Sequence, residues 1–69
     1  MEKSKIIKIN KNDSILDISK IAYMAKEDNR KIHFILDMNN SQLNLTEWYE
    51  SQESRNQWFS KISRELLGE

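Results

Sequence analysis

Apolar and polar residues alternate in four short stretches of the first fifty residues, and this period of two is typical of β-strands with one buried face. The clearest example is the third stretch, where Ile32, Phe34 and Leu36 share one side. Runs containing Asn and Asp separate the stretches and favour turns. The pattern therefore predicts an antiparallel β-meander of three to four strands, at roughly residues 5–9, 20–27, 31–37 and 42–48. Residues 14–19 fit either a brief strand or one helical turn.

The period changes after residue 50, where apolar or long side chains recur every three or four positions, as on one stripe of an amphipathic helix. Ser51 precedes this stretch and suits a helix N-cap, while Gly68 suits a C-terminal stop. We therefore expect a helix at roughly 52–67 that packs on the sheet, giving an α+β fold. The residues that form the stripe are Arg55, Trp58, Phe59, Ile62 and Leu66.

The predicted sheet has more apolar residues than one helix can cover. With Ile21 and Tyr23 placed on the helix side, strand alternation sends another apolar set to the opposite face. We predict that this second set binds a partner, and it consists of Met24, Ile35 and Trp48. The predicted structural core consists of Phe34, Trp58, Phe59 and Ile62.

The spacing Glu50-Ser51-x-Glu53-x-Arg55-x-x-Trp58-x-x-x-Ile62 resembles the last strand and C-terminal helix of a pleckstrin-homology domain. The hairpins before it also resemble the second half of such a domain, so that the resemblance covers roughly residues 14–67. The first three strands of that family and their basic phosphoinositide motif have no counterpart here. The resemblance thus implies a half-domain in which Trp58 packs the helix on the sheet, without a lipid-binding residue.

A chain of 69 residues is expected to form one domain, 1–69, that buries only about 60% of the surface exposed on unfolding. Such small domains are normally reinforced by disulfides, a metal, close packing or self-association. The sequence contains no cysteine and one histidine, so packing and association remain. The N-terminus lacks the apolar run of a signal peptide or membrane span, and we expect a cytoplasmic protein.

The eleven basic and eleven acidic side chains cancel, which makes nucleic acid and membranes unfavoured partners. The distribution is nevertheless uneven, because residues 1–34 hold eight Lys or Arg against five Asp or Glu. An alternative function, binding of a lipid headgroup or of nucleic acid, would use this basic half. Its cations near Tyr23 and Phe34 are Lys20, Lys26, Arg30 and Lys31.

No set of residues in the sequence suggests a catalysed reaction, and we predict no enzyme activity, no metal and no cofactor. His33 has no cysteine or paired carboxylates to complete a zinc set. A serine nucleophile needs a positioned base and an oxyanion hole, and a single glycine excludes a phosphate-cradling loop. The hypothesis that remains is a small protein–protein interaction module, an inhibitor or adaptor of bacterial or phage origin. Its expected partner is another protein or a second copy of the chain.

Overall fold

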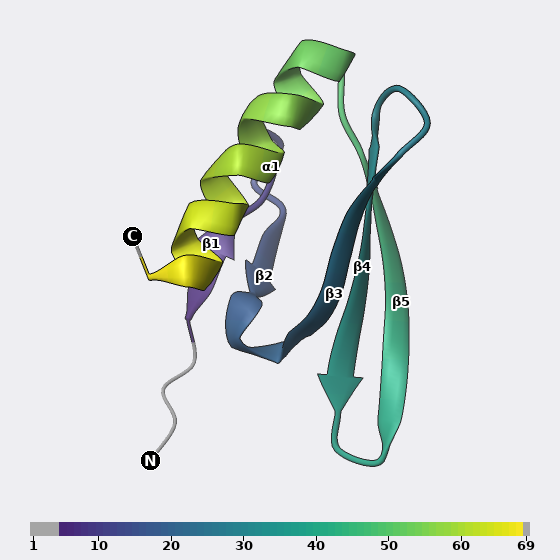
Figure 1. The fold of residues 1–69 in the computed structure, drawn as a ribbon, viewed down its shortest axis with the longest axis vertical. Coiled ribbons are helices and arrows are strands. Elements are labelled where there is room, and N and C mark those ends of the chain that lie inside the picture. The colour runs from purple at the N-terminus through teal and green to yellow at the C-terminus, as the bar shows by residue number, and fades with distance from the viewer. Residues whose placement is uncertain (1–4, 69) are drawn as a thin grey trace.

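The computed structural model describes residues 5–68 and has the α+β fold that the sequence predicts. Two antiparallel sheets, one of two strands and one of three, precede a single C-terminal helix (Figure 1). The elements in chain order are β1 (Ile6–Lys8), β2 (Ile15–Asp17), the 3-10 turn η1 (Ile18–Lys20), β3 (Ile21–Glu27), β4 (Lys31–Met38), β5 (Ser41–Trp48) and α1 (Gln52–Leu67).

Strands β3, β4 and β5 form the predicted antiparallel meander. The β4–β5 turn has only two residues, Asn39 and Asn40, between the paired Met38 and Ser41. Asn39 has a φ of 50°, a left-handed conformation that asparagine adopts more readily than most residues and that tight hairpins need. Asp28 takes the same conformation in the β3–β4 turn. Short polar side chains therefore set both hairpins and, with them, the register of the sheet.

The segment that the sequence left open forms a strand and a helical turn in succession. Strand β2 pairs with β1 within the chain, and the turn between them is closed by a 2.9 Å hydrogen bond from the Ile9 amide to the Ser14 carbonyl. The chain then enters η1, where the Asp17 carboxylate accepts a hydrogen bond from the Ser19 amide at 3.0 Å. This capping bond ends the strand and turns the chain toward β3.

Helix α1 has a defined start and a defined end. The Ser51 hydroxyl accepts a hydrogen bond from the Ser54 amide at 3.0 Å, which satisfies one of the free donors of the first turn. Gly68 ends the helix with a φ of 80°, and its amide donates to the Glu65 carbonyl at 3.2 Å. Glycine adopts this left-handed conformation without steric cost.

The hydrophobic core lies where α1, η1 and one face of the meander meet. Figure 1 shows α1 and the β1–β2 hairpin together on one side of the three long strands. Ile62 supplies the buried apolar side chain of the helix, and Phe34 supplies the largest one of the sheet. The buried apolar residues are Ile9, Ile18, Ile32, Phe34, Leu36, Tyr49 and Ile62.

A β-bulge in β3 changes which side chains face the core. Ile21 pairs with Leu36 but Tyr23 pairs with Ile35, so the register shifts by one residue between them. Side chains after the bulge therefore point to the face opposite to that expected from simple alternation. Met24, which the sequence assigned to the uncovered face, instead lies opposite Phe34 and packs against the core. Tyr23 takes its place on the uncovered face.

Candidate protein-binding surface

We call the side of the meander that faces away from α1 the open face. The cross-strand pairs that form it follow from the register, since directly opposite residues of an antiparallel pair lie on the same side of the sheet. Three of its residues carry large apolar surface and come from three different strands. The residues that define the open face are Tyr23 from β3, His33 and Ile35 from β4, and Asn44 and Trp48 from β5.

The aromatic side chains of the open face are strongly exposed. Tyr23 is 53% exposed and Trp48 is 58% exposed, whereas Ile35 between the strands is half-buried. Of the three residues that the sequence predicted for partner binding, the structure brings Ile35 and Trp48 to this face and places Met24 on the other. Tyr23 is the residue that sequence reasoning missed, because the sequence around Ala22 contains no recognisable signal for a bulge.

A line of polar contacts crosses the open face from β3 to β5. The two ring nitrogens of His33 contact different side chains, with Nδ1 at 3.1 Å from Glu27 Oε2 and Nε2 at 3.1 Å from Asn44 Oδ1. The Tyr23 ring meets the imidazole edge to face, with centroids 6.3 Å apart. Both nitrogens therefore have partners on the sheet, and the contacts of His33 link β4 to β3 and β5 across the open face.

Trp48 lies at the end of the open face among positive charges. The Lys31 ammonium is 4.9 Å from the centre of its ring, and the Arg30 guanidinium is 5.9 Å away, both within the range of cation–π attraction. A hydrogen bond to the Asp28 carboxylate raises the pKa of Lys31, and this rise outweighs the opposing effect of burial. The exposed indole therefore lies within cation–π distance of two cationic side chains.

A buried arginine supports this end of the meander from the helix side. Arg55 is 3% exposed, and its guanidinium donates to the Lys31 carbonyl at 2.9 Å and to the Glu27 carbonyl at 3.3 Å. Its Nε donates to the Asn56 side chain at 2.8 Å. No carboxylate within residues 5–68 lies at ion-pair distance from Arg55, so this cation is satisfied by neutral oxygens. These bonds join α1 to the β3–β4 turn.

The N-terminal hairpin supports the end of β5 in a similar way. The buried side chain of Asn10 donates to the Trp48 carbonyl at 2.8 Å and to Glu47 Oε2 at 2.9 Å. The buried Tyr49 hydroxyl donates to the Ile9 carbonyl at 2.6 Å. Burial raises the pKa of Tyr49, and the nearby Glu47 carboxylate raises it further. Hydrogen bonds from Asn10 and Tyr49 therefore join the end of β5 to the N-terminal hairpin.

The residues predicted as core lie on the covered side. Phe34 and Ile62 are fully buried, while Trp58 and Phe59 are half-buried and pack against the core cluster. The Lys61 ammonium is 4.8 Å from the Trp58 ring centre, and the Lys26 ammonium is 5.1 Å from that of Phe59. Both rings therefore lie within cation–π distance of a lysine.

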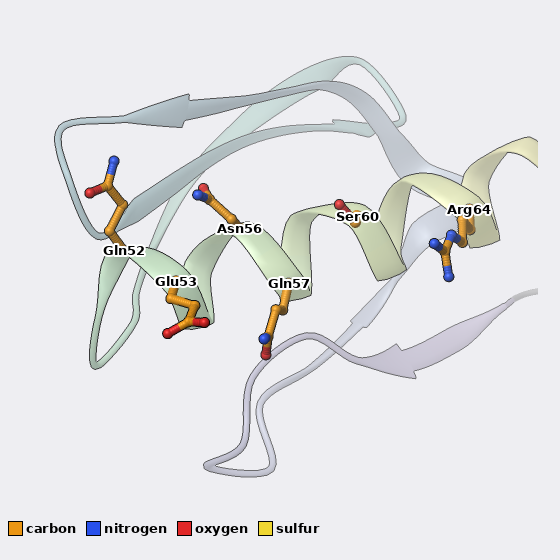
Figure 2. Close-up of a pocket in the computed structure, with 6 residues that line it drawn as sticks. All are labelled: Gln52, Glu53, Asn56, Gln57, Ser60 and Arg64. Atoms are coloured by element: carbon orange, nitrogen blue, oxygen red, sulfur yellow. The ribbon is translucent and has the colours of Figure 1, made fainter.

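A shallow depression on the outer side of α1 is lined entirely by polar helix residues, shown in Figure 2. Gln52 and Asn56 point to one side of the helix, whereas Glu53 and Gln57 point to the other. Because these side chains diverge and come from one element, they do not form a site that could enclose a small molecule. The six lining residues are Gln52, Glu53, Asn56, Gln57, Ser60 and Arg64.

Two negative findings apply to residues 5–68. They contain no cluster of three or more His, Cys, Asp or Glu side chains suited to a metal ion. The helices in this range are also too short or too polar to cross a membrane.

No protein-family model, curated protein or solved structure matches the chain. The similarity to pleckstrin-homology domains therefore stays at the level of architecture, an antiparallel sheet followed by a C-terminal helix.

Proposed function

We propose that this protein is a non-enzymatic protein–protein interaction module, a small inhibitor or adaptor, that docks a partner protein on the open face. The observation that carries the proposal is the apolar surface of Tyr23, Ile35 and Trp48 on the one side of the meander that no described segment covers. Large apolar residues gathered on one face of a small domain are typical of interaction sites.

The energetics favour a protein partner over water on this face. Full burial of a large apolar side chain contributes roughly 1.5–3 kcal/mol, and tyrosine and tryptophan are the residues that most often dominate binding energy. The Tyr23 ring already contacts His33, and the Trp48 ring is already near the Lys31 and Arg30 cations. These contacts favour one arrangement of the two rings and so reduce the side-chain entropy that is lost on binding.

The charges around Trp48 define the chemistry of the partner. Lys31 forms an ion pair with Asp28 at 2.9 Å, whereas Arg30 has no ion pair with any residue in the range 5–68. A complementary partner presents apolar side chains to Tyr23 and Ile35, and a carboxylate to the Arg30 guanidinium beside Trp48. Such a carboxylate would form the charge-assisted hydrogen bonds that arginine favours.

Affinity capture with matched variants tests this proposal. A cell extract is passed over the immobilised wild type and two immobilised variants, and the proteins that each retains are compared. Ile35→Glu adds a charge to the open face, and Gln57→Glu adds the same charge to the exposed outer side of α1. Circular dichroism checks that all three are folded. The retained protein is then purified and titrated calorimetrically against each variant. We expect unchanged affinity for Gln57→Glu and a loss of at least about tenfold for Ile35→Glu, since the glutamate must be desolvated.

Equal affinity of the wild type and Ile35→Glu for the purified partner would refute docking on the open face. Retention of a second copy of the chain alone, or of nucleic acid alone, would also overturn the proposal. The Arg30 contact has a separate readout, because Arg30→Gln should weaken binding and reduce its dependence on ionic strength.

The alternative function, binding of nucleic acid or lipid headgroups, is favoured by the presence of aromatic rings and cations at one end of the open face. Stacking rings beside cations suit single-stranded nucleic acid. The basic N-terminal half is less available than its charge indicates, because its side chains Lys5, Lys8, Lys11 and Lys31 each form an ion pair with a carboxylate. Titration with a single-stranded oligonucleotide and with anionic vesicles at low salt decides this point, and we expect neither to bind.

A further inference from the structure

The outer edge of β5 is free along most of its length. The hydrogen bond from the Tyr49 amide to the Arg30 carbonyl, 2.8 Å long, fixes which residues of β5 point their backbone groups toward β4. Backbone groups alternate along an antiparallel strand, so Ser41, Leu43, Leu45 and Glu47 bond to β4. The N–H and C=O groups that point outward belong to the intervening residues Gln42, Asn44, Thr46 and Trp48.

Only the last outward carbonyl has a partner within residues 5–68. The Trp48 carbonyl accepts the hydrogen bond from Asn10 at 2.8 Å, which confirms the outward direction and closes the edge at that point. The backbone N–H and C=O groups of Gln42, Asn44 and Thr46 bond to no described residue, and all three side chains are exposed. A regular edge strand in this state is a template for another strand.

Strand β5 also has few of the devices that usually block edge pairing, and Glu47, near its end, is its only charged residue. Its sequence, Ser-Gln-Leu-Asn-Leu-Thr-Glu-Trp, contains no lysine, arginine or proline, and its register with β4 is unbroken. Charged side chains, proline and bulges are the common means by which proteins protect an edge. The opposite edge of the meander, β3, is protected in this way by its bulge after Ile21 and by Lys26 and Glu27.

We infer that two copies of this chain pair antiparallel through the free edge of β5, about a twofold axis at Asn44, to form one six-stranded sheet. The register follows from the free groups. Because the Trp48 carbonyl is occupied, the available segment is Gln42–Thr46, and its midpoint is Asn44. In this register Asn44 bonds to Asn44 of the second copy, and Gln42 bonds to Thr46 of the second copy in both directions.

The side chains of β5 complement themselves in that register. On the helix side, Leu43 lies opposite Leu45 of the second copy, and pairing covers Leu43, which is 49% exposed in the single chain. The only ionic side chain of the strand, Glu47, lies opposite Ser41. The two Glu47 side chains are therefore separated by about six residues, or roughly 20 Å along the strand, which exceeds the Debye length at physiological salt. No like charges oppose each other.

This pairing stops at two copies, because each copy uses the same edge of β5. The outer edges of the new sheet are the two protected β3 strands, which do not add further copies. The inference goes beyond the proposed function, because it concerns a backbone edge and stands whether or not the open face docks another protein.

Sedimentation equilibrium between micromolar and millimolar concentration tests the pairing, with a dimer expected at twice the chain mass of 8.3 kDa. Thr46→Pro removes an outward N–H and leaves the β4 ladder intact, a position at which an edge strand tolerates proline. Thr46→Val keeps the N–H and serves as the control. We expect Thr46→Pro to raise the dimer dissociation constant by about tenfold or more, and Thr46→Val to leave it close to the wild type.

Amide hydrogen exchange supplies a readout that is specific to the register. In the wild-type dimer the amides of Gln42, Asn44 and Thr46 become protected, and this protection rises with protein concentration. In Thr46→Pro, which has no amide at position 46, the protection of the Gln42 and Asn44 amides falls. A strictly monomeric protein over the whole concentration range would overturn the inference. So would a dimer that Thr46→Pro leaves intact while Ile35→Glu abolishes it, because that dimer would use the open face.

Discussion

Arg55 is the residue whose replacement tests the architecture most directly. Its guanidinium is buried without a carboxylate partner and donates to the carbonyls of Lys31 and Glu27. Arg55→Met keeps most of the side-chain volume but removes these donors. Two opposing effects follow: the methionine no longer needs a buried charge to be desolvated, which stabilises the fold, while the carbonyls lose their partners, which destabilises it.

The magnitudes indicate that the loss of hydrogen bonds wins. No buried side-chain nitrogen or oxygen within residues 5–68 lacks a partner, so the hydrogen bonds of the guanidinium already offset its desolvation. A hydrogen bond to a charged group contributes about 1.5–3 kcal/mol, and an unpaired buried carbonyl costs about 1–3 kcal/mol. We expect Arg55→Met to lower the free energy of unfolding by about 2–3 kcal/mol, a large share of the roughly 3–10 kcal/mol expected for a chain of this size.

Urea denaturation followed by tryptophan fluorescence measures this change, provided that the slope with urea concentration stays constant. The control is Arg64→Met, which removes an exposed arginine from the same helix and should change stability by less than about 0.5 kcal/mol. If Arg55→Met equalled or exceeded the wild type in stability, the desolvation of the buried charge would outweigh its hydrogen bonds, and the assigned role of Arg55 would be wrong.

Two further predictions concern aromatic residues of the core. Trp58→Ala should cost about 2 kcal/mol rather than the 3–5 kcal/mol of a fully buried aromatic, because the ring is half-buried, and a thermal melt measures the loss. Tyr49→Phe removes the hydrogen bond to the Ile9 carbonyl and should cost about 1–2 kcal/mol. Burial raises the pKa of Tyr49 above its ordinary value of 10.0, so the stability contributed by the neutral phenol is complete below pH 10 and is lost as the pH rises above it. Urea titrations between pH 8 and 11 should therefore show a steeper alkaline loss for the wild type than for Tyr49→Phe, and equal slopes would contradict this role.

The α+β class could be predicted because its signals are local. Alternation identifies the strands around Phe34 and Leu45, and Ser51 and Gly68 carry the capping chemistry of the helix. The position of Met24 could not be predicted, since it depends on a bulge that reverses the direction of every later side chain in β3. Alternation assumes an unbroken register, and nothing in the sequence around Ala22 indicates that the register breaks.

The buried polar residues were beyond sequence reasoning for another physical reason. Asn10 looks like an ordinary turn residue, yet its side chain reaches Trp48 and Glu47 from the far end of the chain. Arg55 belongs to the helical stripe, but its partners are backbone carbonyls, which every residue has and no sequence pattern marks. Contacts between a side chain and a distant backbone depend on the final fold and leave no periodic signal.

The open face and the free edge of β5 are one continuous surface. The same residues of β5 direct their backbone groups outward and their side chains onto the open face, because the two directions share the period of the strand. Pairing through Asn44 therefore joins two open faces edge to edge, with a Trp48 from each copy on the same side of the enlarged sheet. A partner that repeats its contact, or is itself twofold, would then bind both faces at once and gain affinity without any new kind of contact. Disrupting the edge with Thr46→Pro should therefore weaken the binding of such a twofold partner more than it weakens a partner that contacts a single open face.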